Sequence, residues 1–134
     1  MPPTALEFLT VRHLATLTLL RADGSPHVTP VGVTWDPEAG LARIITWSGS
    51  TKARILERTG GGRAAVCQVD GARWLTLEGH AVVTGDPERT AEAVRRYGER
   101  YRPAKDRGPE RRAIEITVDR VLGSRSILQP DAPR

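Results

Sequence analysis

Apolar and polar residues alternate over short stretches of the chain, which is the period of strands that bury one face. This alternation, with the turn signals between stretches, predicts six strands, over residues 14–20, 27–35, 41–47, 64–69, 73–83 and 113–118. Asp23-Gly24 and Asp70-Gly71 each separate two stretches, and Asp-Gly is a strong signal for a tight hairpin. The pattern therefore predicts antiparallel strands joined by hairpins, with a meander over the first three.

Two residues interrupt the predicted strands in ways that shape the sheet. Pro30 lies within residues 27–35 and has no N–H to donate, so this strand should have a free edge or a bulge there. Gly79 falls on the same face of its strand as Leu75 and Leu77, which is the predicted core face. A glycine at such a position indicates a bend or a bulge.

Helical signals occupy gaps between the strands. Thr4, with Glu7 three residues later, has the capping-box spacing and predicts a short helix to about residue 12. Residues 52–58 are good helix formers that end at three glycines, and Asp86-Pro87 predicts the start of a helix that runs to about residue 101. These elements indicate a mainly β fold, a small antiparallel β-barrel with peripheral helices. An open, one-layer sheet is the structural alternative.

Length and hydropathy fit one soluble domain. A chain of 134 residues can bury one core, which we expect over about residues 5–126, with residues 127–134 as a tail. No apolar run approaches the roughly 20 residues that span a bilayer, so no membrane association is expected. The start lacks a secretory signal, and the single cysteine, Cys67, has no partner for an internal disulfide. We therefore expect a cytoplasmic protein.

Arginine dominates the charge of the chain. Lys and Arg together number 20 against 16 Asp and Glu, and only Lys52 and Lys105 among these cations are lysines. Arginine binds carboxylates and phosphates through paired hydrogen bonds, so the composition favours anionic ligands. Aromatic residues make up only 4% of the chain and acids are mixed among the arginines, which argues against nucleic acid as a partner.

One segment carries a candidate anion site. Residues 48–54 combine hydroxyl groups, a helix N-terminus and two cations, and this combination can hold a phosphate. The spacing is not that of a P-loop. The alternative is an ordinary helix start, with Ser50 or Thr51 as the N-cap and with Lys52 and Arg54 in solvent.

No residue pattern indicates a metal, a nucleophile or a general acid. His13, His27 and His80 lack metal-ligand spacing, and no serine stands in a G-x-S-x-G context. Cys67 lies in an apolar strand and is expected to be a small core residue. An enzyme with these features would take its reactive atoms from a bound cofactor.

Several short motifs stand in a characteristic order along the chain. They are residues 13–18, 23–32, 42–46, 50–53, 68–79, 114–116 and 120–124. In order and spacing they resemble the pyridoxamine 5′-phosphate oxidase-like split β-barrel family, and within it the branch that uses coenzyme F420. The resemblance covers about residues 5–126.

The resemblance implies a six-stranded antiparallel split β-barrel of the FMN-binding type and a homodimer with cofactor sites at the interface. It places the cofactor phosphate on Ser50, Thr51 and Lys52, with Arg54 as a further contact. Strand residues border the tricyclic ring, and Gln68 lies close to it. The implied cofactor-binding residues are His27, Val28, Thr29, Pro30, Val31, Arg43, Ile44, Ile45, Thr46, Ser50, Thr51, Lys52, Arg54 and Gln68.

The resemblance also implies an activity. It predicts an oxidoreductase that passes a hydride from reduced F420 to a small conjugated acceptor, with the linear tetrapyrrole biliverdin as the specific expectation and bilirubin as the product. FMN is the alternative cofactor, and an FMN- or haem-binding barrel without this activity is the alternative function. Vitamin B6 oxidation is not expected, because the chain has no Trp beyond Trp74 to form the C-terminal Trp/Arg motif of those oxidases.

Overall fold

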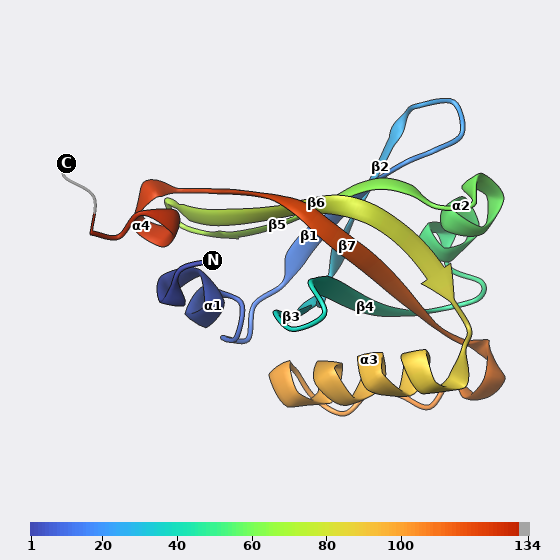
Figure 1. Ribbon diagram of the computed structural model, residues 1–134. Coiled ribbons are helices and arrows are strands. Elements are labelled where there is room, and N and C mark those ends of the chain that lie inside the picture. Colours follow the sequence, from blue (N-terminus) through green and yellow to red (C-terminus); the bar gives the residue numbers. More distant parts are fainter. Residues whose placement is uncertain (132–134) are drawn as a thin grey trace.

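A computed structural model of the protein describes residues 1–131. Seven strands and four α-helices follow one another in these residues (Figure 1). Their bounds are α1 Pro3–Phe8, β1 Ala15–Leu20, β2 Pro26–Val31, β3 Thr34–Asp36, β4 Leu41–Trp47, α2 Thr51–Thr59, β5 Gly62–Asp70, β6 Arg73–Thr84, α3 Pro87–Arg100, β7 Arg111–Gly123 and α4 Arg125–Leu128. A short 3-10 turn, Gly108–Glu110, precedes β7. None of the helices in residues 1–131 has the length and apolar character needed to cross a membrane.

All seven strands belong to one antiparallel sheet in the order β2-β1-β5-β6-β7-β4-β3. The two edge strands, β2 and β3, are consecutive in the chain and are joined only by Gly32 and Val33. Three Cα steps cover at most about 11 Å, so the two edges of the sheet must come close together. The sheet therefore curls back on itself, and the one-layer alternative is wrong.

The number of strands differs from the prediction of six. Residues 27–35 were predicted as one strand, whereas β2 pairs with β1 only up to Val31 and β3 pairs with β4 from Thr34. Gly32 and Val33 cross from one edge of the sheet to the other and take no part in either ladder. In the sequence the apolar residues Val31, Val33 and Trp35 keep alternating with other residues through this crossing, so the pattern alone did not reveal it.

The two predicted irregularities are confirmed. Pro30 lies on β2, an edge strand of the sheet, where its missing N–H disrupts no second ladder. Gly79 marks a register shift between β6 and β7. A Cβ at this position would lie 1.9 Å from the carbonyl oxygen of Thr117, so only glycine allows the two strands to approach here.

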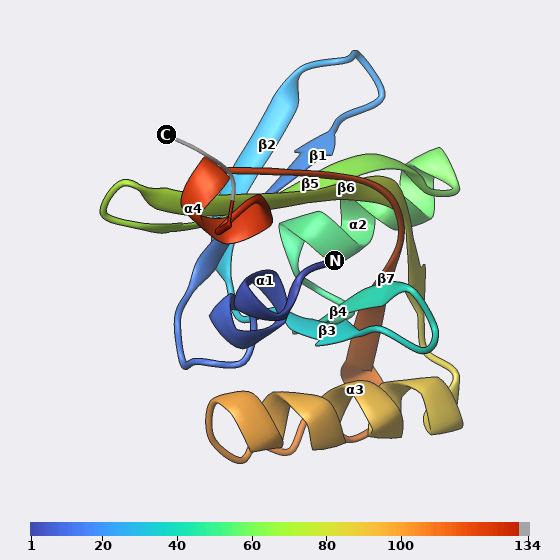
Figure 2. The ribbon, with the colours of Figure 1, turned by 60° about the vertical axis from the view of Figure 1, so that its left-hand side comes forward.

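The helix caps are partly as predicted. Asp86 caps α3 by accepting a hydrogen bond from the backbone N–H of Arg89, as expected. Thr4 was expected to cap the first helix, but α1 begins at Pro3 and its N-cap is Pro2. The hydroxyl of Thr4 instead donates to the carbonyl of Ile127 and ties α1 to α4, which lie side by side in Figure 2.

The core fills the inside of the curled sheet. Its largest fully buried side chains include Leu17, Ile44, Leu77 and Ile116 from four strands. Ile127 of α4 is also fully buried, so the core extends past residue 126 into residues predicted as tail. The end of that predicted tail, residues 132–134, lies outside the described residues.

Helix α3 covers the outer face of β3, β4 and β7 (Figure 1). Charged side chains are paired beneath it. Asp36 accepts a hydrogen bond from Arg43 over 2.8 Å and lies 3.1 Å from Arg96 of α3. Arg89 of α3 forms an ion pair with the buried Glu115 of β7. These pairs fix α3, and α3 positions the loop that follows it.

Candidate functional site

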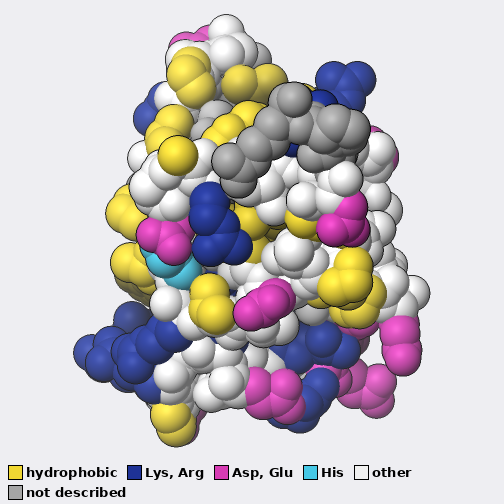
Figure 3. All heavy atoms as spheres, turned by 90° about the vertical axis from the view of Figure 1, so that its left-hand side faces the viewer, with side chains coloured by type: hydrophobic (Ala, Val, Ile, Leu, Met, Phe, Trp, Pro, Cys, Tyr) yellow, Lys and Arg dark blue, Asp and Glu magenta, His cyan; other side chains and the backbone are white. Residues whose placement is uncertain are grey.

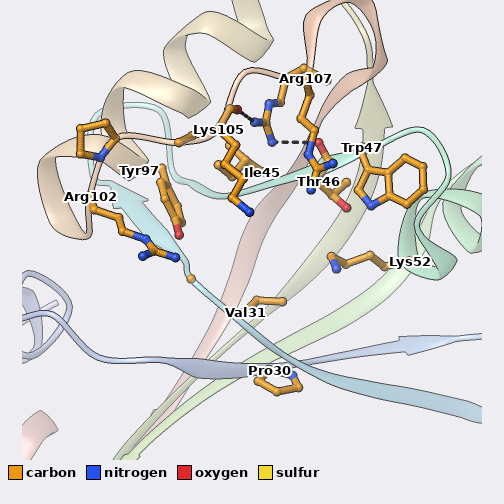
Figure 4. Close-up of a pocket in the computed structure, with 14 residues that line it drawn as sticks. Pro30, Val31, Ile45, Thr46, Trp47, Lys52, Tyr97, Arg102, Lys105 and Arg107 are labelled. Atoms are coloured by element: carbon orange, nitrogen blue, oxygen red, sulfur yellow. Dashed lines mark hydrogen bonds between the residues drawn. The ribbon is translucent and has the colours of Figure 1, made fainter.

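A cavity of about 490 Å³ lies where β2, the end of β4, the start of α2 and the loop after α3 meet (Figure 4). We call residues 102–107 of that loop the basic loop. The cavity is lined by Pro30, Val31, Gly32, Ile45, Thr46, Trp47, Lys52, Tyr97, Arg102, Pro103, Ala104, Lys105, Arg107 and Arg111.

The strands supply an apolar wall. Pro30 and Val31 come from β2, and Ile45 and Trp47 come from the end of β4. Both segments lie near the junction between the sheet edges, so their side chains line one cavity although they are distant in the sequence. Such a wall suits the face of a flat ring.

The opposite walls are basic. Five cations line the cavity, and no acidic side chain of the described part of the chain does. They are Lys52, Arg102, Lys105, Arg107 and Arg111. None of these five cations forms an ion pair with an acid in residues 1–131. Their charges therefore add up rather than cancel, and the cavity attracts anions.

Lys52 enters the cavity from the first turn of α2. Ser50 caps this helix by accepting a hydrogen bond from the N–H of Ala53 over 3.2 Å, and the hydroxyl of Thr46 donates to Ser50 over 2.6 Å. No acidic residue occupies the first turn. Burial lowers the pKa of Lys52, because the charged ammonium loses solvent without gaining a partner. An anion beside Lys52 would restore that lost stabilisation.

Arg111 holds the basic loop over the cavity. Its guanidinium donates to the carbonyl of Thr46 over 3.2 Å and to the carbonyl of Lys105. Burial, and then the neighbouring charge of Arg107, lower the pKa of Arg111. The guanidinium of Arg107 lies 5.6 Å from the ring centre of Trp47. The basic loop is therefore held in place by contacts with β4, through Arg111 to Thr46 and through Arg107 to Trp47.

The structure brings five of the sequence-predicted residues together at this cavity. They are Pro30, Val31, Ile45, Thr46 and Lys52. Ser50 does not line the cavity. Its hydroxyl accepts hydrogen bonds from the N–H of Ala53 and from the hydroxyl of Thr46, which does line it. The strand residues His27, Val28 and Thr29 lie further along β2 and do not line the cavity.

Three other predicted residues face elsewhere. Arg43 lies beneath α3 in its pair with Asp36, and Ile44 is buried in the core. Gln68 is also buried, and its amide nitrogen donates to the carbonyl of Phe8 over 2.7 Å while its oxygen accepts from Arg100. Both ends of this amide are satisfied inside the protein, so Gln68 offers nothing to the cavity directly. Cys67, predicted to be a core residue, is only half-buried.

Thr51 and Arg54 line a separate hollow of about 430 Å³ between α2 and the hairpin of β1 and β2. Arg21 and Arg58 line the same hollow. The predicted phosphate segment is thus divided, because successive residues of the first helical turn point in different directions. Lys52 points to the main cavity, and its neighbour Thr51 points away from it.

Sequence reasoning missed the residues that come from α3, the basic loop and the start of β7. Tyr97, Arg102, Lys105, Arg107 and Arg111 all follow Gln68, the last residue of the predicted site. The signal present was a charged loop with proline, but nothing local showed that it folds over the ends of β2 and β4. In residues 1–131 no group of three His, Cys, Asp or Glu side chains is placed to hold a metal ion.

Comparison with known proteins gives a consistent family relationship. The pattern of the pyridoxamine 5′-phosphate oxidase family matches residues 1–125. The F420H(2)-dependent biliverdin reductase of Mycobacterium tuberculosis (strain CDC 1551 / Oshkosh) is 52% identical over 124 residues, which are 92% of this chain and 88% of that protein.

Solved structures share the fold. A structure described as an F420 reductase superposes with a TM-score of 0.72 at 21% identity, covering 91% of this chain and 98% of that one. A conserved hypothetical protein from Mycobacterium tuberculosis superposes with a TM-score of 0.74 at 24% identity, covering 92% and 84%. At these identities the likeness establishes the fold alone.

Proposed function

The chain belongs to the pyridoxamine 5′-phosphate oxidase family, and from this premise we propose that it is an oxidoreductase that reduces biliverdin to bilirubin with reduced coenzyme F420. The reductase from Mycobacterium tuberculosis that is 52% identical supports both the cofactor and the substrate. The observation on this chain that carries the proposal is the cavity itself, which combines an apolar strand wall with cations that have no acidic partner in residues 1–131.

The residues present fit a planar cofactor that bears a phosphate. Lys52 is a partly buried cation without an acidic partner, at a helix start where backbone N–H groups also favour an anion. Pro30, Val31 and Ile45 form the adjoining wall, against which a ring can pack. We assign the phosphate to Lys52 and the ring to this wall.

The chemistry divides between the cofactor and the chain. When held by Lys52 and the strand wall, reduced F420 would supply a hydride, which together with one proton converts biliverdin to bilirubin. The contribution of the chain is to hold both molecules in contact and to keep water away from the apolar wall. The cations of the basic loop favour negative charge on the acceptor.

We further propose that two copies of the chain form a dimer with the cofactor at their interface. The support is an uncharged row on the outside of the sheet, in which Pro30, Thr16, Cys67, Thr76 and Leu122 lie in register across five strands. Pro30 belongs to both this row and the cavity, so a second copy on the row would cover the cavity rim.

Exposed apolar side chains flank the row. Val28 is 58% exposed, Val69 53% and Trp74 37%. Exposed apolar side chains on both sides of an uncharged row favour an interface at this face of the sheet. We expect Thr76→Glu, which places a charge within the row, to convert a dimer into a monomer in sedimentation. A monomeric unsubstituted protein would contradict the dimer.

That the protein is located in the cytoplasm, and that residues 1–134 form a single domain, remain predictions.

The experiment that tests the function is an anaerobic titration with F420 and, separately, with FMN. The proteins compared are the unsubstituted chain, Lys52→Ala and, as a control, Arg125→Ala, whose arginine is exposed on α4. We expect F420 to bind more tightly than FMN, and Lys52→Ala to weaken F420 binding by about 1–3 kcal/mol. Arg125→Ala should bind as the unsubstituted chain does. Preference for FMN would contradict the proposed cofactor.

A further inference from the structure

A second hollow of about 490 Å³ adjoins the cofactor cavity. Arg12, His13 and Leu14 line it on one side, and Tyr97, Tyr101 and Arg102 line it on the other. Tyr97 and Arg102 line both hollows, so the two are continuous past these side chains. In Figure 4 both of them enter the cavity from the α3 side, opposite Lys52.

The aromatic side of this hollow is rigidly built. The rings of Tyr97 and Tyr101 stack with their centres 5.0 Å apart. The hydroxyl of Tyr101 donates to the carbonyl of His13 over 2.7 Å and accepts from the N–H of Val33 over 3.0 Å. Both rings pack on Gly32, where a Cβ would lie 2.9 Å from Tyr97 and 3.0 Å from Tyr101. The pair therefore presents a fixed flat surface for a conjugated molecule.

The two arginines that line the hollow, one on each side, have no acidic partner among the described residues. Neither Arg12 nor Arg102 forms an ion pair or a side-chain hydrogen bond within residues 1–131, whereas most arginines of α3 are paired. Among the described residues, no acidic side chain lines this hollow. Figure 3 shows basic side chains gathered at one lower edge of the face that carries α1 and α4, beside α3. Free guanidinium groups around an aromatic floor suit a carboxylate, which they bind through paired hydrogen bonds.

We propose that this second hollow is the carboxylate-recognition site for the electron acceptor, with Arg12 and Arg102 as the specificity-determining residues and the Tyr97–Tyr101 pair as the floor. The inference rests on the proposed function, because it assumes that the cofactor occupies the cavity beside Lys52. Such a site would favour conjugated acceptors that carry carboxylate groups over neutral acceptors. Biliverdin meets this requirement, since it carries propionate groups on a conjugated tetrapyrrole.

The test compares biliverdin with its dimethyl ester, which keeps the conjugated rings and lacks the carboxylate charges. Binding is measured by titration to the complex with oxidised F420, so that no turnover is needed. The proteins are the unsubstituted chain, Arg12→Ala, Arg102→Ala and the control Arg125→Ala. F420 affinity is measured for each, and Arg12 does not line the cofactor cavity, so Arg12→Ala should bind F420 unchanged.

We expect each of Arg12→Ala and Arg102→Ala to weaken biliverdin binding by about tenfold or more, and to leave binding of the ester unchanged. Arg125→Ala should bind both as the unsubstituted chain does. Equal affinity of the unsubstituted chain for acid and ester, or equal losses for both ligands in the variants, would overturn the carboxylate site. Selective binding of the acid without its reduction would retain this site and would instead refute the proposed reaction.

Discussion

Arg100 donates a hydrogen bond to the side-chain oxygen of Gln68 over 2.6 Å, and both side chains are buried. The same guanidinium donates to the carbonyl of Val33 over 2.6 Å and to that of Val11 over 3.0 Å. No carboxylate pairs with it in residues 1–131, and burial lowers its pKa. Helix α3 is thereby tied to β5 and to the crossing, whose Gly32 lines the cavity that also contains Lys52.

Substitution of Gln68 should destabilise the fold more than it weakens cofactor binding. Gln68→Leu leaves the carbonyl of Phe8 and one nitrogen of Arg100 without partners, and we expect it to lower the free energy of unfolding by about 1–3 kcal/mol. Urea unfolding measures this loss, and Gln129→Leu at an exposed position is the control. A large loss of F420 affinity with unchanged stability would instead place Gln68 in the cofactor site.

Substitution by alanine should change the stability of the protein in opposite directions at Gly32 and at Gly98. Gly32→Ala forces a Cβ against Tyr97 and Tyr101, and we expect it to destabilise the protein by about 1–3 kcal/mol and to weaken acceptor binding. Gly98 has open space around it within α3, so Gly98→Ala should stabilise by up to about 1 kcal/mol. Thermal unfolding and biliverdin titration distinguish them, and equal effects would refute the close contact.

The cofactor affinity should depend on pH through Lys52. A free lysine has a pKa of about 10.4. Burial lowers the pKa of Lys52, so Lys52 loses its charge at a lower pH than a free lysine does. An anion favours the charged form, so F420 affinity is full below the pKa of the free protein and falls as the pH rises through it. Lys52→Arg should extend the plateau, since arginine stays charged. Titrations from neutral to alkaline pH measure this, and an identical profile in Lys52→Ala would exclude Lys52.

Asp36 should contribute stability that disappears in acid. The hydrogen bond from Arg43 lowers the pKa of Asp36, so the stabilisation is present above the unfolded value near 3.9 and is lost as the pH falls through the lower folded value. At neutral pH we expect Asp36→Asn to cost about 1.5–3 kcal/mol. Urea unfolding should show the difference from the unsubstituted chain shrinking in acid. A difference that grows in acid would contradict this assignment.

Local patterns predicted the strands and their irregularities well, because the physics is local. Pro30 on an edge and Gly79 at a bulge follow from a missing N–H and a missing side chain. The split of residues 27–35 into β2 and β3 was not predictable in this way. It depends on which distant strands Val31 and Thr34 pair with, and the period of two is the same on either side.

The sequence predicted only part of the site, again because sequence patterns report local structure. Lys52 and the ends of β2 and β4 carry recognisable local motifs, whereas Arg102 and Tyr97 reach the cavity only because α3 packs across the sheet. For Gln68 the resemblance implied a place close to the cofactor ring. In the structure its amide is held by the carbonyl of Phe8 and by the guanidinium of Arg100 from α3, and no local pattern predicts these distant contacts.

The proposed reaction is tested most directly by following the hydride. Reduced F420 with both C5 hydrogens replaced by deuterium is mixed anaerobically with biliverdin and the protein, and the bilirubin formed is analysed by mass spectrometry and NMR. We predict one deuterium at the central methylene carbon of bilirubin for each cofactor oxidised. Bilirubin without the label, or oxidation of the cofactor without bilirubin, would contradict direct hydride transfer between the two molecules in this cavity.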